Sequence, residues 1–328
     1  LAHWLSQTKR SGDERRDYIQ EKDIATIAEL GFDHVRLPID EMQMWDELGN
    51  RDEAAFEIMH KAIRWSLKYK MRVLIDLHIL RSHHFNAEEK PLWTETEAQD
   101  HFINLWRDLS KALNDYPVDM VAYELMNEPV ADDPNDWNTL LARAFAVVRE
   151  LEPERTVVIG SNRWQSADTF DELVVPDDDN IILSYHFYEP FMLSHYRTSW
   201  TFLKDYTGPV HYPGVILTQE EFDALPEEQK EVAKDWVGRT FDRQVLVTMM
   251  EKPLRVAKTL GLPLYCGEYG VFDKAPVADK LRWYADMLSI FKEHGVSSAN
   301  WNYKSDSFGF VGNDGQSITE MKDVLLEN

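Results

Sequence analysis

Short apolar segments alternate with longer stretches in which apolar residues recur every three or four positions, and this alternation runs along the whole chain. The short segments predict buried strands, and the longer periodic stretches predict amphipathic helices. The predicted strands are Leu1–Leu5, His34–Ile39, Arg72–His78, Met120–Asn127, Thr156–Gly160, Ile181–Tyr188, Leu262–Glu268 and Ser298–Tyr303. The predicted helices are Glu21–Leu30, Glu53–Tyr69, Thr96–Leu113, Asp136–Leu151, Glu220–Leu260 and Asp279–Glu293, with about one helical turn at Ala167–Leu173.

Strands separated by helical crossovers predict a parallel α/β sheet, and eight such strands are enough to close a (β/α)8 barrel. The alternative is an open, doubly wound sheet. That fold commonly carries a glycine-rich phosphate turn after an early strand, and the early strand–helix junctions of this chain contain none. No Gly- or Ser-rich linker divides the sequence, so residues 1–328 are predicted to form one domain.

Polar residues share one face on several of the predicted strands. Asp76 and His78 alternate with apolar residues on one strand, and His186 and Tyr188 do the same on another. Arg36 interrupts a third strand in the same way. A single buried His or Arg is often only a structural residue, but polar groups directed to one axis from several strands predict a polar pocket.

Two glutamates each close an apolar segment. Glu128 ends the strand that contains Met120–Asn127, and Glu268 ends Leu262–Glu268. A pair of carboxyl groups is the minimum equipment for cleaving a glycosidic bond, because one protonates the leaving oxygen while the other attacks or activates water. Either glutamate alone could equally cap a helix or pair with an arginine.

The neighbouring side chains fit a sugar site. Arg36 can fork onto a carboxylate and hold it ionised, which would lower the pKa of a nucleophilic glutamate. Tyr188 can donate to a carboxylate, and Asn127 suits a sugar hydroxyl. His78 and His186 can bind hydroxyl groups or tune a neighbouring acid. A flat indole can support a pyranose ring, and the candidates are Trp164 and Trp301, for which core packing is the alternative.

Composition restricts the partners. A net charge of −23 argues against nucleic acid and against an anionic membrane surface, both of which require basic residues. No apolar segment approaches the roughly 20 residues of a transmembrane helix. The single cysteine, Cys266, excludes an internal disulfide and is expected to pack as a small buried residue.

Two weaker patterns resemble metal sites. His78, His83 and His84 lie close together, but no cysteine or suitably spaced acid accompanies them, so a sugar-binding loop that includes His84 is the preferred interpretation. Asp132 and Asp133 lack the remaining ligands of a calcium loop and are expected to begin a helix at Pro134.

Taken in order, these residues resemble glycoside hydrolase family 5, the large cellulase and mannanase family of clan A. The similarity includes Asn-Glu-Pro around the acid/base, a glutamate in Gly-Glu-Tyr-Gly as nucleophile, Val-Arg-Leu-Pro, Asp-Leu-His, His-x-Tyr and a tryptophan on the last strand. The eight matching positions are Arg36, His78, Asn127, Glu128, His186, Tyr188, Glu268 and Trp301.

The resemblance implies a retaining hydrolase with a (β/α)8 barrel, no cofactor and no metal, which acts on a polysaccharide or oligosaccharide. We expect an endo-β-1,4-glucanase with Glu268 as nucleophile and Glu128 as acid/base. The alternatives are another β-glycan (mannan, xyloglucan, mixed-linkage glucan, arabinoxylan or galactan) or a non-catalytic carbohydrate-binding barrel. We also expect a monomer that is secreted or periplasmic. Family members usually have residues before the position of Leu1, so the first strand is expected to be incomplete.

Overall fold

The computed structural model describes residues 1–314 and 321–326. Its main sheet has seven strands in the hydrogen-bonded order β1-β2-β3-β4-β5-β8-β9. The strands are β1 (His34–Asp40), β2 (Arg72–Ile79), β3 (Val121–Glu124), β4 (Val157–Gly160), β5 (Ile181–Phe187), β8 (Leu264–Tyr269) and β9 (Ser297–Asn300). Internal contacts divide the chain into two compact units, the first made of Leu1–Tyr185 and Val256–Tyr265, and the second made of His186–Arg255 and the chain from Cys266 onward.

In the first unit, strands β1 to β5 pair in parallel and in sequence order. The register places Val73 beside Val121 and Val157 beside Ile181, so the apolar rows of adjacent strands line up. Nearly every residue of β1 and β2 is buried, as expected for strands covered on both faces. Polar side chains on these strands therefore need partners inside the protein.

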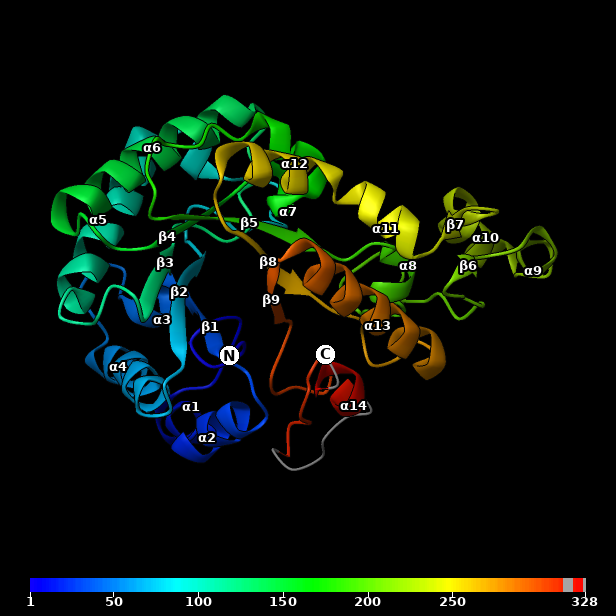
Figure 1. Ribbon diagram of the computed structural model, residues 1–328, viewed down its shortest axis with the longest axis horizontal. Coiled ribbons are helices and arrows are strands. Elements are labelled where there is room, and N and C mark those ends of the chain that lie inside the picture. Colours follow the sequence, from blue (N-terminus) through cyan, green and yellow to red (C-terminus); the bar gives the residue numbers. More distant parts are fainter. Residues whose placement is uncertain (315–320, 327–328) are drawn as a thin grey trace. The chain divides into compact units, whose positions relative to one another are not determined.

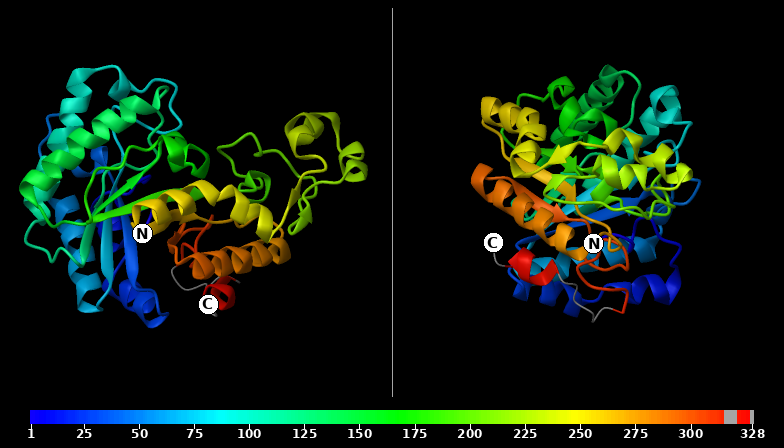
Figure 2. Two further views of the ribbon diagram at one scale, coloured as in Figure 1. Left: turned by 45° about the horizontal axis from the view of Figure 1, so that its top comes forward. Right: turned by 90° about the vertical axis from the view of Figure 1, so that its right-hand side faces the viewer.

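Helices connect these strands and lie outside them (Figure 1; left view of Figure 2). The helices of the first unit are α1 (Gly12–Tyr18), α2 (Glu21–Glu29), α3 (Glu41–Met44), α4 (Glu53–Lys68), α5 (Thr96–Leu113), α6 (Pro134–Leu151) and α7 (Asn162–Gln165), with the 3-10 helices η1 (Pro91–Trp93) and η2 (Ala167–Glu172). Asp133 caps α6 by accepting a hydrogen bond from the Asn135 N–H, and Pro134 is its first residue. The predicted helix start at this position is confirmed.

Two buried tryptophans fasten the helices to the strand ends that carry polar residues. Trp106 of α5 donates its indole N–H to the Leu125 carbonyl at 2.9 Å. Trp137 of α6 donates to the Gly160 carbonyl at 2.9 Å. Both helices therefore fix the loops that follow β3 and β4, in addition to covering the sheet.

The second unit contains the ends of β5 and β8, strand β9 and a small antiparallel pair. The pair is formed by β6 (Gly214–Val215) and β7 (Thr240–Phe241). The helices that lie in this unit or begin in it are α8 (Phe191–Ser194), α9 (Gln219–Asp223), α10 (Glu227–Ala233), α11 (Arg243–Met249), α12 (Glu251–Leu260), α13 (Val277–His294) and α14 (Met321–Leu326), with the 3-10 helix η3 (Lys234–Trp236). Trp283 of α13 donates to the Glu189 carbonyl at 2.9 Å, which ties this helix to the segment after β5.

Two predicted elements were wrong. Leu1–Leu5 is not a strand, because His3 has a φ angle of 62°, which turns the backbone out of the extended conformation. Only Leu5 forms a bridge, parallel to Ile39. The predicted helix Glu220–Leu260 is divided into α9, α10, η3, β7, α11 and α12.

Proline and glycine account for the divided helix. Pro226 stands in extended backbone directly before α10. Gly238 has a φ of 72°, which favours glycine, and it leads into β7. Asp242 then starts α11 by accepting a hydrogen bond from the Val245 N–H. The apolar periodicity continued through these breaks because each short piece packs its own apolar residues.

Candidate active site

Glu128 lies in a turn that follows β3. The Asn127 N–H donates to the Leu77 carbonyl at 3.0 Å, which keeps this part of the chain beside β2. Glu128 then adopts a φ of 47°, and its N–H donates to Gln165 Oε1 at 3.1 Å. A left-handed conformation is uncommon for a residue other than glycine and is often found at functional sites.

Arg36 organises the buried polar groups behind this turn. Its Nε and Nη2 donate to the two carboxylate oxygens of Glu124, at 2.6 and 3.1 Å. Nη2 also lies 2.9 Å from Asn127 Oδ1 and 2.9 Å from Asp76 Oδ2. Arg36 therefore forks onto a carboxylate, as predicted, but this carboxylate is Glu124, whereas the prediction placed the fork on a nucleophilic glutamate.

Glu124 and Asp76 are completely buried next to this guanidinium. Burial raises the pKa of Asp76 to about 7 and raises the pKa of Glu124, while the charge of Arg36 opposes both changes. Removal from water disfavours a charged carboxylate, which explains the direction of both shifts. Arg36 is thus the countercharge for two buried acids.

The three histidines after β2 have different surroundings. His78 Nδ1 lies 2.7 Å from Asp76 Oδ2, and its Nε2 lies 3.3 Å from Gln7 Nε2. His83 is buried, its Nε2 accepts a hydrogen bond from the Val130 N–H at 3.2 Å, and burial lowers its pKa to about 3. His84 is exposed, and its Nδ1 accepts from the Asn86 N–H at 3.1 Å.

Each of these rings therefore uses a nitrogen within the protein. Burial also lowers the pKa of His84, which favours the neutral ring. Sugar binding by His78 and His84 remains a prediction, as does the absence of a metal from this group.

Trp164 lies in the turn after β4. Arg163, Trp164 and Gln165 are three consecutive left-handed residues, with φ angles of 55°, 61° and 51°. Trp164 is 44% exposed, although a tryptophan of this size usually packs inside a protein. Its exposure removes the core-packing alternative, while its use as a sugar platform stays a prediction.

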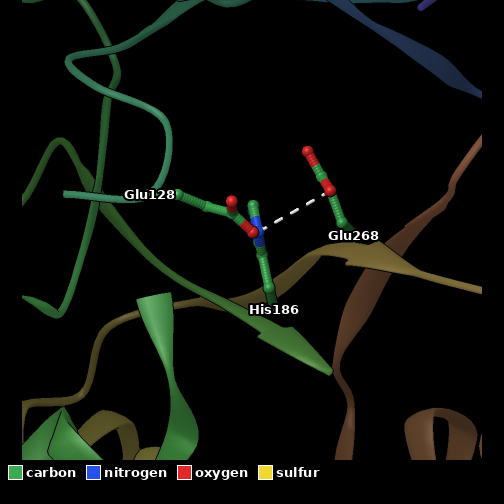
Figure 3. A group of neighbouring side chains, drawn as sticks. All are labelled: Glu128, His186 and Glu268. Carbon is green, nitrogen blue, oxygen red and sulfur yellow. Dashed lines mark ion pairs between the residues drawn. The ribbon is translucent and has the colours of Figure 1, made fainter. Parts of the chain in front are cut away.

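Glu268 is buried near the end of β8, in the second unit. The Tyr188 hydroxyl donates to its Oε2 at 2.9 Å, and His186 Nδ1 lies 3.7 Å from the same oxygen. Figure 3 draws the His186–Glu268 ion pair as a dashed line. Cys266 is buried, as predicted, and its Sγ lies 3.3 Å from the Glu268 carbonyl oxygen.

Aromatic residues surround Tyr188 in this unit. Its ring meets His195 and Phe308 edge to face, with centroids 5.1 and 6.1 Å away. The Trp301 N–H donates to the Tyr269 carbonyl at 2.9 Å, and the indole is half-buried directly after β9. Trp301 therefore follows the last strand, as expected, and its contact with a sugar remains a prediction.

Among the residues that contact the candidate site and were not expected from the sequence are Glu124, Gln165, His195 and Phe308. Glu124 could have been found, since a charged residue inside an otherwise apolar strand requires a partner. Gln165 and His195 carry no comparable signal, because their roles depend on contacts between separate loops.

Comparison with known proteins identifies relatives along almost the entire chain. The model of the cellulase family (glycosyl hydrolase family 5) matches residues 5–307. Endoglucanase C of Acetivibrio thermocellus is 30% identical over 98% of this chain and 94% of its own length. Cellodextrinase A of Ruminococcus flavefaciens is 30% identical over 90% of this chain and 82% of its own.

The crystal structure of endoglucanase Cel5A from Thermotoga maritima has the same fold. It superimposes with a TM-score of 0.77 at 23% identity, covering 99% of this chain and 94% of the other. The predicted (β/α)8 barrel is thereby confirmed.

Proposed function

The chain belongs to glycosyl hydrolase family 5 and is a glycoside hydrolase, and from this premise we propose that it is a retaining endo-β-1,4-glucanase. The name of the Acetivibrio thermocellus relative supports this activity. The observation that carries the mechanism is the buried Glu268 carboxylate, which has Tyr188 and His186 at one of its oxygens. A carboxylate oriented in this way is suited to be a nucleophile.

In the first step, a carboxylate oxygen of Glu268 forms a bond to the anomeric carbon while the bond from that carbon to the leaving oxygen breaks. Glu128 gives its proton to the leaving oxygen. In the second step, Glu128 takes a proton from water, and the resulting hydroxyl displaces Glu268 from the anomeric carbon. Two displacements restore the original β configuration.

The remaining candidate residues would bind the sugar. Asn127 has the donor and acceptor groups that a hydroxyl requires, and the exposed Trp164 offers an indole face. His78, His84, His186 and Tyr188 would bind hydroxyl groups or orient the nucleophile, and Trp301 would support a pyranose ring. No cofactor takes part in either step.

Two alternatives remain open. The first is a different β-glycan, and structures of Thermotoga maritima Cel5A have been solved in complex with mannotriose as well as with cellobiose. The second is a carbohydrate-binding barrel without activity, which is expected to lack one of the two glutamates. Both Glu128 and Glu268 are present.

The proposed partner is a polysaccharide or oligosaccharide, and the net charge of −23 disfavours nucleic acid. Among residues 1–314 and 321–326, no helix is both long enough and apolar enough to cross a membrane. We propose a monomer that acts outside the cytoplasm, as a secreted or periplasmic enzyme.

The test is a screen of defined β-glucan, mannan, xylan and galactan oligosaccharides with sizing of the products. Rapid formation of short cello-oligosaccharides from long ones supports the proposal. Faster cleavage of another glycan corrects the substrate, and loss of activity in Glu128→Gln and Glu268→Gln supports the two catalytic assignments. A chelator such as EDTA should leave the wild-type rate unchanged, because no metal is used.

A further inference from the structure

The segment that carries Glu128 is held by the turn after β4. Glu128 N–H donates to Gln165 Oε1 at 3.1 Å, and Trp164 N–H donates to the Pro129 carbonyl at 3.2 Å. The side-chain amide of Asn162 pairs with both backbone groups of Ala131, at 2.8 and 2.9 Å. The turn after β4 therefore contacts the backbone at Glu128, Pro129 and Ala131, in addition to the contacts that Leu77 and His83 make with Asn127 and Val130.

Gln165 connects this segment to the buried charges. Its Oε1 accepts from the Glu128 N–H, while its Nε2 donates to Glu124 Oε1 at 3.2 Å. Glu124 in turn accepts a hydrogen bond from Arg36 Nε. A primary amide supplies an acceptor on one side and a donor on the other, which neither a carboxylate nor an apolar side chain can do.

The surroundings are fitted to this amide. Gln165 is completely buried. A Cβ atom added at Gly160 would lie 2.3 Å from Gln165 Nε2, so a glycine is needed to leave room for the amide. Glu128 and Gln165 also have φ angles of 47° and 51°, and left-handed residues persist only where their surroundings determine the backbone.

We propose that Gln165 is a positioning residue for Glu128, and this inference rests on the acid/base role proposed above. By holding the Glu128 N–H against the Arg36–Glu124 pair, Gln165 sets the direction in which the Glu128 carboxyl group points. Proton transfer to a leaving oxygen depends steeply on that direction. Attack by Glu268 does not depend on it.

The test compares substrates with different leaving groups in Gln165→Met. On a cello-oligosaccharide, whose leaving oxygen needs a proton, kcat/KM should fall by about 10- to 100-fold. On dinitrophenyl cellobioside, whose leaving group needs none, kcat/KM should change by less than about threefold. The matched control is Gln229→Met. Gln229 Oε1 accepts from the Thr207 N–H and its Nε2 donates to the Thr207 hydroxyl, so the control removes a similar pair of contacts and should leave both rates unchanged.

Two further variants make the result decisive. Gln165→Glu keeps the shape and the acceptor but loses the donor to Glu124, so it should show the same dependence on leaving group even if Gln165→Met does not fold. An equal loss on both substrates in the folded variants would overturn the positioning role. Glu128→Gln is the reference, and if it fails to distinguish the two substrates, the acid/base assignment and this inference both fail.

Discussion

The Tyr188 hydroxyl donates a hydrogen bond of 2.9 Å to Oε2 of Glu268, at the end of β8. Because a tyrosine side chain has few rotatable bonds, this hydrogen bond holds the Glu268 carboxylate in one orientation. His186 Nδ1 lies 3.7 Å from the same oxygen, so two residues near the end of β5 act on one atom of the proposed nucleophile.

Tyr188→Phe should lower kcat/KM by about 10- to 100-fold. A hydrogen bond to a charged group contributes about 1.5–3 kcal/mol, and each 1.4 kcal/mol corresponds to a factor of ten. The measurement is steady-state kinetics on the best natural oligosaccharide. The control is Tyr116→Phe, which removes the hydroxyl that contacts His60 in the first unit and should leave kcat/KM unchanged. Equal rates for Tyr188→Phe and the wild type would exclude this hydrogen bond from the mechanism.

Arg36→Met should lower the free energy of unfolding by about 3–5 kcal/mol, because it leaves Asp76 and Glu124 buried without their countercharge. Urea denaturation followed by fluorescence measures this change. Arg51→Met is a matched control, since Arg51 also contacts both oxygens of a carboxylate, Asp108, but near the surface. Arg51→Met should lower the free energy of unfolding by at most about 1 kcal/mol. A similar loss in both variants would contradict the importance of burial.

Helix positions were predictable where the signal is local. Thr96–Leu113 was predicted to the residue and Glu53–Tyr69 to within one, because the apolar stripe of each helix lies within the segment itself. The strand predicted at Leu1–Leu5 was wrong because Ala2, Trp4 and Leu5 are indeed buried, but in a backbone that turns at His3. Burial was readable from the sequence, and backbone direction was not.

Some residues of the candidate site could likewise be predicted from the sequence, and others could not. Residues such as Arg36 and Glu268 stand out in the sequence because polar groups on apolar strands require an explanation. Gln165 does not, since a glutamine in a loop is ordinary, and its importance arises from Glu124 and Glu128, which are about 40 residues away in the chain. Such pairings are set by tertiary packing.

Asp76→Asn should change how stability depends on pH. Burial raises the pKa of Asp76 from 3.8 to about 7, so between these values the folded state binds more protons than the unfolded state. The contribution of Asp76 to the free energy of unfolding therefore falls as pH rises from about 4 to about 7. In Asp76→Asn, the free energy of unfolding should no longer show this decrease with pH.

Urea denaturation at pH 4.5 and pH 7.5 measures the effect in Asp76→Asn and in the control Asp119→Asn, which replaces an exposed carboxylate. The control should keep the wild-type slope. An unchanged slope in Asp76→Asn would mean that Asp76 stays ionised across this range beside Arg36.

The carboxyl groups of Glu128 and Glu268 should lie about 5–5.5 Å apart in a crystal structure of the enzyme, the separation found in retaining glycosidases. That spacing allows direct attack on the anomeric carbon. A separation of roughly 7 Å or more leaves room for a water molecule and would indicate inversion, or a wrongly assigned pair.

Azide should distinguish the two glutamates by the stereochemistry of the product. In Glu128→Ala, an activated aryl glycoside can still form the glycosyl-enzyme, but hydrolysis is slow because no base activates water. Azide needs no deprotonation, so it should restore turnover and give the β-glycosyl azide. In Glu268→Ala, azide occupies the vacated side of the sugar and should give the α-glycosyl azide. NMR of the products from both variants decides the matter: interchanged products would reverse the two roles, and no rescue in either variant would refute the double displacement.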